Sequence, residues 1–178
     1  MELFDLYTAD REKTGKTMVR GNPTPEGFYR LVVHVCIFDT EGRMLIQQRQ
    51  PFKRGWSNMW DVSVGGAAVA GDSSRTAAER ETREELGLAV DLSDIRPTMT
   101  IYWENGFDDY YVLTMEVDLQ TLKLQESEVQ RVKWADQGEI LRMIDDGRFI
   151  PYEKSQIELL FFRRNYRSSH TRSDPTNN

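Results

Sequence analysis

The chain has 178 residues, of which 39% are hydrophobic and 29% are charged, and its formal net charge is −6. This length suits a single domain that buries about 70% of its unfolded surface, and the acidic balance argues against general nucleic-acid binding. A single cysteine, Cys36, excludes a disulfide within the chain and favours a reducing, cytoplasmic location. No apolar run approaches the ~20 residues of a membrane-spanning helix, so we expect no membrane association.

The first part of the chain predicts a hairpin and two longer strands. FDLYT and KTMVR flank a polar segment, which indicates an N-terminal hairpin over residues 3–20. Residues 30–38, RLVVHVCIF, are almost all apolar, and this pattern is typical of a strand buried on both faces. We therefore expect His34 to be a core residue rather than a ligand. After a DTEG turn, residues 43–49 predict the returning strand, and a loop with two tryptophans and two basic residues occupies residues 50–60.

A helix is expected between Ser73, a good N-cap, and Gly87, which favours the left-handed conformation that ends helices. Two strands flank the turn at Asn105 and Gly106. The remaining expected elements are a short strand at 61–66, strands at 95–104, 108–119 and 129–134, a helix that Asp136 caps and that runs to about residue 146, and a last helix at 153–164.

Strands and helices are mixed without strict alternation, which predicts an α/β fold with a mixed sheet and helices on its faces. We expect residues 1–166 to form one domain, in which the hairpin is an N-terminal extension. The last twelve residues, 167–178, are polar and are expected to form a disordered tail.

The segment RETREELG, residues 80–87, places Glu81, Glu84 and Glu85 within about 100° of the helix circumference. Like charges three and four residues apart repel each other and destabilise a helix. A solvated face with an ion pair from Arg80 to Glu84 is one explanation. However, a glycine-rich turn leads directly into this helix, and three carboxylates on one face offer the oxygen ligands that Mg²⁺ prefers. We therefore expect a divalent cation, Mg²⁺ or alternatively Mn²⁺, to offset the repulsion.

The segment from Gly66 to Leu88 resembles the Nudix box of the MutT/Nudix hydrolases. That pattern is a glycine, five residues, a glutamate, seven residues and then R-E-aliphatic-x-E-E-x-G-aliphatic. This chain has Asp72 in place of the first glutamate and Thr82 in place of an aliphatic residue, and it keeps the R-E-x-x-E-E core. The flanking strands extend the resemblance over about residues 2–150. The resemblance implies the Nudix α/β/α sandwich, a mixed sheet between helices.

The resemblance also implies an activity, namely attack of water on phosphorus in a nucleoside diphosphate that is linked to another group. Glu81, Glu84 and Glu85 would be metal ligands together with the carbonyl of Gly66, and Glu84 would also take part in catalysis. Arg80 would orient a glutamate rather than contact the substrate, which is expected to be a small diphosphate molecule.

Further site residues are expected outside the box. Glu128 is a candidate general base and Glu126 a candidate metal ligand, although a purely polar loop explains both equally well. Arg49, with its planar guanidinium, and Lys53 are candidate ligands for substrate phosphates. The sequence leaves two roles open for the aromatic residues, stacking on the substrate and ordinary packing. These residues are Trp56, Trp60, Tyr102 and Trp103.

Two other functions stay open. The N-terminal extension and the E-x-E-V segment at residues 126–129 resemble isopentenyl-diphosphate isomerase, which shares the fold. That enzyme carries a cysteine and a nearby histidine before the box helix, where this chain has Gly65 and Ala67. A non-catalytic module that senses a nucleotide is the second alternative, and the complete carboxylate set argues against it. The sequence identifies neither the diphosphate substrate nor the oligomeric state, for which a homodimer is the commonest form.

Overall fold

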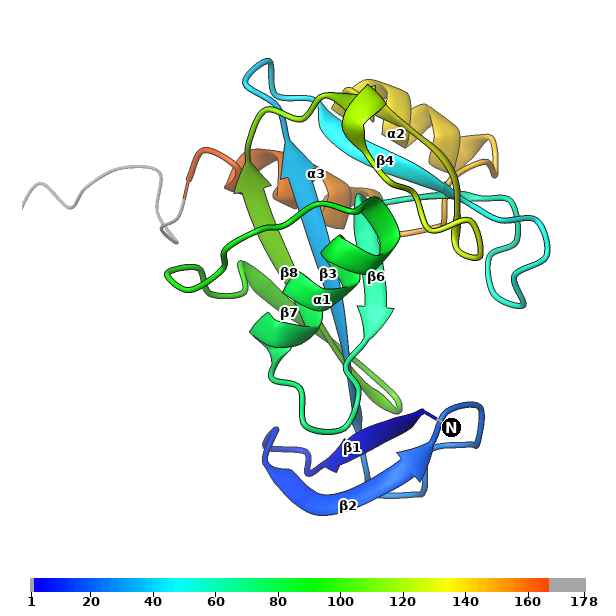
Figure 1. The fold of residues 1–178 in the computed structure, drawn as a ribbon, viewed down its shortest axis with the longest axis vertical. Coiled ribbons are helices and arrows are strands. Elements are labelled where there is room, and N and C mark those ends of the chain that lie inside the picture. Colours follow the sequence, from blue (N-terminus) through cyan, green and yellow to red (C-terminus); the bar gives the residue numbers. More distant parts are fainter. Residues whose placement is uncertain (1, 167–178) are drawn as a thin grey trace, which may run out of the picture.

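The computed structural model describes residues 2–166, so the tail expected at residues 167–178 lies outside the described residues (Figure 1). The chain forms a two-stranded sheet and a seven-stranded sheet. The strands are β1 (Leu3–Tyr7), β2 (Lys13–Val19), β3 (Arg30–Phe38), β4 (Met44–Arg49), β5 (Trp60–Asp61), β6 (Val64–Ala67), β7 (Met99–Trp103), β8 (Gly106–Thr114) and β9 (Val129–Ala135). The helices are α1 (Ser74–Leu86), α2 (Gln137–Asp145) and α3 (Lys154–Arg163), with a 3-10 turn, η1, at Leu119–Thr121.

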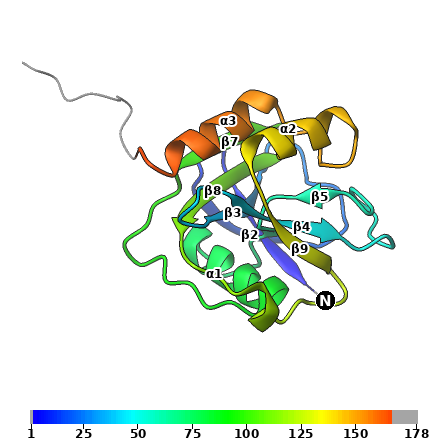
Figure 2. The ribbon, with the colours of Figure 1, turned by 90° about the horizontal axis from the view of Figure 1, so that it is seen from above.

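The large sheet lies between α1 on one face and α2 with α3 on the other (Figure 2). Its central strand, β3, pairs in parallel with β8 along its whole length and antiparallel with β6. At its far end, β3 also pairs with β4, through Phe38 and Met44. Because β4 then pairs with β5 and β9, the sheet divides at this edge of β3 into two arms. The predicted mixed sheet between helices is therefore confirmed.

The strand expected at residues 61–66 is in fact two strands with different partners, since β5 pairs with β4 and β6 pairs with β3. Ser63 lies between them and explains the break. Its hydroxyl donates to the carbonyl of Leu45 at 2.5 Å and accepts from the amide of Ile37 at 2.8 Å. A side chain thus takes the place of a backbone ladder bond where the chain crosses from one arm to the other.

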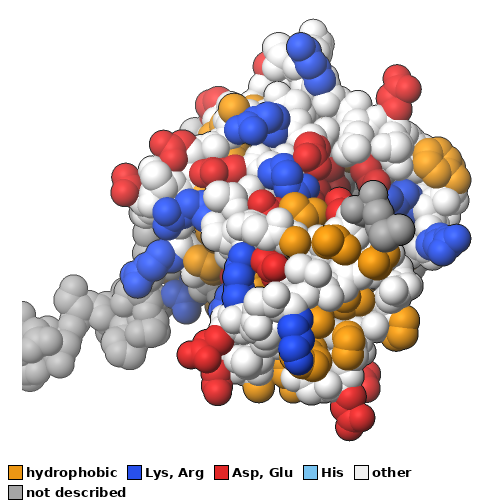
Figure 3. Space-filling model, turned by 60° about the horizontal axis from the view of Figure 1, so that its bottom comes forward, with side chains coloured by type: hydrophobic (Ala, Val, Ile, Leu, Met, Phe, Trp, Pro, Cys, Tyr) orange, Lys and Arg blue, Asp and Glu red, His pale blue; other side chains and the backbone are white. Residues whose placement is uncertain are grey.

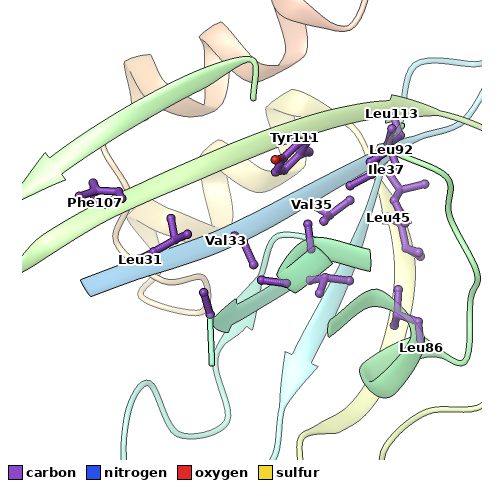
Figure 4. Packing of buried hydrophobic residues seen from close by; sticks show 14 of the residues in the cluster. Leu31, Val33, Val35, Ile37, Leu45, Leu86, Leu92, Phe107, Tyr111 and Leu113 are labelled. Carbon is purple, nitrogen blue, oxygen red and sulfur yellow. The ribbon is translucent and has the colours of Figure 1, made fainter. Parts of the chain in front are cut away.

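The predicted burial of β3 on both faces is correct. Val33, Val35 and Ile37 point to the α1 side and pack with Leu86 (Figure 4). Cys36 and Phe38 point the other way, into the core under α2 and α3. Each face of the strand thus contributes to a separate core, which accounts for the lack of alternation in its sequence.

Helix α1 begins and ends as its sequence predicts. The hydroxyl of Ser73 accepts from the Thr76 amide, and the Thr76 hydroxyl accepts from the Ser73 amide, which completes a capping box. Gly87 ends the helix in the left-handed conformation, with φ 66°. Small or apolar residues, among them Thr82, bring the helix onto the sheet, since Ala77, Ala78, Thr82 and Leu86 are fully buried.

The predicted N-terminal hairpin is confirmed as β1 and β2, which lie at the lower end of the molecule in Figure 1. Its apolar residues pack under the turn that leads into α1. In that turn, the amide of Ala70 donates to the carbonyl of Leu3 at 2.7 Å, and the amide of Gly71 donates to Asp5 at 2.9 Å. The hairpin therefore supports the loop that positions α1. Within residues 2–166, no helix is long and apolar enough to cross a membrane.

Candidate active site

Arg80 is the centre of the acidic cluster on α1. Its Nη1 donates to Glu81 at 2.9 Å and to Glu84 at 3.1 Å, and its Nη2 donates to Asp72 at 2.9 Å and to the carbonyl of Ala67 at 3.2 Å. These contacts offset part of the repulsion that the sequence predicts, so a cation is not the only source of compensation. They also show that Asp72 reaches the arginine although it is shorter than the glutamate of the family pattern.

Glu81 lies against β6, and its position depends on a glycine. A Cβ atom built at Gly66 would overlap with the carboxyl group of Glu81, so a larger residue would force the carboxylate away. The side chain of Glu81 is only 14% exposed. Burial raises its pKa, and the positive charge of Arg80 opposes that change. Gly66 thus allows a carboxylate to lie directly beside the strand backbone.

Glu85 is the most deeply buried carboxylate of the cluster. Its Oε2 accepts from the amide of Gln47 at 2.8 Å and from the backbone amide of Gly65 at 3.4 Å. Burial raises the pKa of Glu85 to about 8, the hydrogen bond from Gln47 opposes this rise, and the charges of Glu81 and Asp61 add to it. The sequence analysis missed Gln47. Its place two residues before Arg49 in a strand, and so on the same face, was the available signal.

The donor set suits a divalent cation, because Mg²⁺ and Mn²⁺ favour carboxylate and carbonyl oxygens. Glu84 is half exposed, whereas Glu81 and Glu85 lie deeper beside β6. In the part of the chain that the structure describes, no three Asp, Glu, His or Cys side chains converge as a preformed metal site. The reason is visible in the contacts, since Arg80 holds Glu81 and Glu84 while Gln47 holds Glu85. A cation would compete with Arg80 for two of the three carboxylates.

The other expected site residues come from two loops. Glu128 forms an ion pair with Lys53, and its carbonyl accepts from the amide of Gln50 at 3.0 Å, so the expected base and an expected phosphate ligand lie together. Glu126 is exposed. The guanidinium of Arg49 donates to the carbonyl of Gly55 at 3.2 Å, and its charge faces an acidic side chain on β5, with Nη1 3.9 Å from the carboxylate of Asp61.

One more basic residue, Arg20, directly follows the hairpin strand β2. A hydrogen bond to Glu2 raises the pKa of Arg20, and the charges of Glu128 and Glu81 raise it further. Seen from the hairpin end of the molecule, Asp and Glu side chains lie among Lys and Arg side chains rather than forming a purely acidic surface (Figure 3). This face of the molecule therefore carries side chains of both charges.

The aromatic residues separate into two groups. Trp56 and Tyr102 are exposed, so both are accessible for stacking. Trp60 is buried in the core under α2 and α3, and the indole of Trp103 donates to Asp108 at 2.8 Å. Cys36 is fully buried, and burial raises the pKa of its thiol, so it is not a reactive cysteine.

Comparisons with known proteins agree with this architecture. A family model of the NUDIX domain matches residues 28–154. An uncharacterized Nudix hydrolase of Listeria monocytogenes is 46% identical over 152 residues, which cover 85% of this chain and 90% of that protein. A crystal structure of a Deinococcus radiodurans protein has a TM-score of 0.72 and 26% identity, and covers 89% of this chain and 97% of its own. An isopentenyl-diphosphate Δ-isomerase of Shigella flexneri is 27% identical over 150 residues, which cover 79% of this chain and 80% of the isomerase.

A mixed sheet between helices, with a carboxylate-rich helix after a glycine turn, defines the Nudix class of proteins, and this chain belongs to the Nudix family. Within the family it is a Nudix hydrolase, an enzyme that acts on anhydrides in phosphorus-containing small molecules. The N-terminal hairpin lies outside the range that the family model matches.

Proposed function

We propose that the chain is a metal-dependent pyrophosphohydrolase that cleaves the diphosphate linkage of a nucleoside diphosphate–X molecule by attack of water on phosphorus. The observation that carries this proposal is the complete carboxylate set, Glu81, Glu84 and Glu85, on the face of α1 beside Gly65 and Gly66. With the carbonyl of Gly66, these residues would hold Mg²⁺ or, alternatively, Mn²⁺. When bound, the cation would supply charge neutralisation at the diphosphate and activation of water.

The chain's own residues have distinct proposed roles. Arg80 orients Glu81 and Glu84 through the hydrogen bonds described above. Glu84 is the most exposed of the three carboxylates, and we assign it a catalytic role in addition to metal binding. Arg49 and Lys53 bind phosphate oxygens of the substrate.

For the loop before β9, we propose that Glu128 is the general base once a substrate phosphate has drawn Lys53 away from it. Glu126 is a proposed further metal ligand. We also propose a cytoplasmic location, because the chain has a single cysteine. We propose a homodimer, because dimers are the commonest oligomers.

This chain lacks the reactive groups of the isomerase. Gly65 and Ala67 stand where the isomerase has its cysteine and histidine, and the one thiol of the chain, Cys36, is fully buried. A sensor would not need the full set of carboxylates, and it is distinguished from an enzyme by turnover.

The test is hydrolysis of a panel of diphosphate compounds with Mg²⁺, Mn²⁺ or EDTA, with the products identified by mass spectrometry. Glu84→Gln should lower turnover by about 100-fold or more, because it removes a key charge, and the fold should survive. Glu158→Gln on the exposed face of α3 is the matched control. Normal turnover in Glu84→Gln would refute the site. Isomerisation without phosphate release would favour the isomerase, and binding without turnover would favour the sensor.

A further inference from the structure

The sheet face opposite α1 carries a second polar cluster, away from the carboxylates of the box. Arg30 and His34 lie on the same face of β3, and Asp108 on β8 and Trp103 on β7 lie beside them. None of these residues belongs to the box segment, and none has a role in the proposed hydrolysis. They form a row in which charged and aromatic groups alternate across the sheet.

Asp108 anchors this row. Its Oδ1 accepts from the indole N–H of Trp103 at 2.8 Å, and its Oδ2 lies 3.3 Å from Nε2 of His34. The imidazole of His34 stacks on the ring of Tyr110, with 4.4 Å between the ring centroids. Asp108 thus contacts Trp103 and His34, and within residues 2–166 no hydrogen bond joins its carboxylate to Arg30.

The guanidinium of Arg30 makes no hydrogen bond to another of the described residues. Its guanidinium lies between two rings, 5.9 Å from the centroid of Phe4 and 5.4 Å from that of Trp103. Within residues 2–166, its buried Nε has no hydrogen-bond partner, and no ion pair compensates its charge. Burial lowers the pKa of Arg30, and the charge of Asp108 only opposes that change. A buried guanidinium N–H without a partner carries a desolvation cost, which a ligand that accepts a hydrogen bond from it would offset.

The row lies just across β6 from the proposed active site. On one side of this strand, Gly66 packs against Glu81. On the other side, a Cβ atom at Gly65 would lie 3.1 Å from Nδ1 of His34, which is buried and has no hydrogen-bond partner among the described residues. His34, at one end of the row, therefore lies across one glycine-rich strand from Glu81, and Arg30 lies four residues before His34 on the same face of β3.

We propose that Arg30, clamped between Phe4 and Trp103, binds a phosphate or carboxylate carried by the part of the substrate beyond the cleaved diphosphate. The planar guanidinium matches the two oxygens of such an oxyanion, and the rings hold it in one orientation before binding. The hairpin supplies Phe4, so the N-terminal extension would contribute to specificity. The assignment to the substrate rests on the proposed function, whereas the affinity of Arg30 for an oxyanion does not.

The direct test is an NMR titration with EDTA present, so that it needs neither metal nor turnover. The indole N–H signal of Trp103, assigned with Trp103→Phe, is followed while inorganic phosphate or, separately, acetate is added. The signal should move, and Arg30→Gln should weaken the apparent affinity about tenfold or more. The preferred anion then tells a phosphate from a carboxylate ligand. Arg75→Gln removes the same charge from an exposed position of α1 and should behave as wild type. An immobile Trp103 signal with both anions in the wild type would overturn the proposal, whatever the variants do.

The second test compares UDP-glucose with UDP-glucuronate, which differ by one carboxylate. The wild type should favour the glucuronate through KM, and Arg30→Gln should reduce that preference about tenfold with little change in kcat, while Arg30→Lys should retain part of it. An unchanged preference in Arg30→Gln would contradict the subsite. If neither compound is hydrolysed with any metal, the proposed function fails for this substrate class, and the NMR titration still decides the role of Arg30.

Discussion

Glu85 is the residue where folding and the proposed chemistry conflict most. It is buried beside Glu81 and Asp61, and a neutral amide, that of Gln47, is its strongest hydrogen-bond partner. A buried carboxylate without a cation favours its protonated form. The helix spacing predicts that Glu85 belongs to the cluster, whereas its burial depends on β4 and β6 and is visible only in the folded chain.

This conflict predicts how stability depends on pH in the metal-free protein. The pKa of Glu85 rises from 4.5 to about 8 on folding, so between these values the folded state binds more protons than the unfolded state. The stability then decreases as the pH rises, by up to about 1.4 kcal/mol for each pH unit. Glu85→Gln should reduce this slope and leave the part that the raised pKa of Glu81 contributes, and urea unfolding in EDTA from about pH 5 to about pH 8 would measure the difference. Glu158→Gln should keep the slope, and equal slopes in wild type and Glu85→Gln would contradict the burial of a carboxyl group.

At the scale of elements, Asp109 connects the hairpin, the sheet and α1. It is fully buried on β8 and accepts from Arg11 at 2.7 Å, from Thr100 at 2.6 Å and from Ser74, the first residue of α1, at 2.6 Å. Arg11 lies in the hairpin turn at φ 66° and covers the ring of Phe107 at 4.6 Å. A charged side chain from the turn thus attaches the hairpin to the rest of the domain.

Breaking this attachment should destabilise the whole domain. Arg11→Met leaves Asp109 buried with one hydrogen bond fewer and no positive partner, and we expect a loss of about 2 kcal/mol, less than for a fully buried pair because Arg11 is partly exposed. Arg20→Ala removes an exposed ion pair from the same hairpin and should cost about 1 kcal/mol or less. Chemical denaturation gives both values. Equal losses for the two variants would show that Arg11 does not hold the hairpin in place.

At the scale of the whole molecule, a cation that binds at the carboxylate cluster should raise the free energy of unfolding of the whole chain. A ligand that binds only the folded state adds about 2.7 kcal/mol at 100 times its Kd. We therefore expect Mg²⁺ or Mn²⁺ to raise the Tm of the wild type relative to EDTA, as calorimetry would show, and to have little effect on Glu81→Gln. In Glu158→Gln the cation should act as in the wild type. A cation effect of the same size in Glu81→Gln would place the metal elsewhere.

Local patterns predict the elements and the core of the box. The apolar run of β3, the caps of α1 and the spacing of Glu81, Glu84 and Glu85 depend on the periods of strands and helices, which act over a few residues. The break between β5 and β6 escaped prediction because the Ser63 hydroxyl bonds to two other strands.

Tertiary structure alone decides which distant residues meet. Arg11 and Asp109 are 98 positions apart, and Gln47 and Glu85 are 38 positions apart. No local period relates such residues, because their contact depends on how strands are ordered and how α1 lies on the sheet. The same holds for Arg30, which the sequence places only at the start of a strand. Two rings from β1 and β7 enclose its guanidinium, and only the packed sheet shows that this cation is left without a hydrogen-bond partner among the described residues.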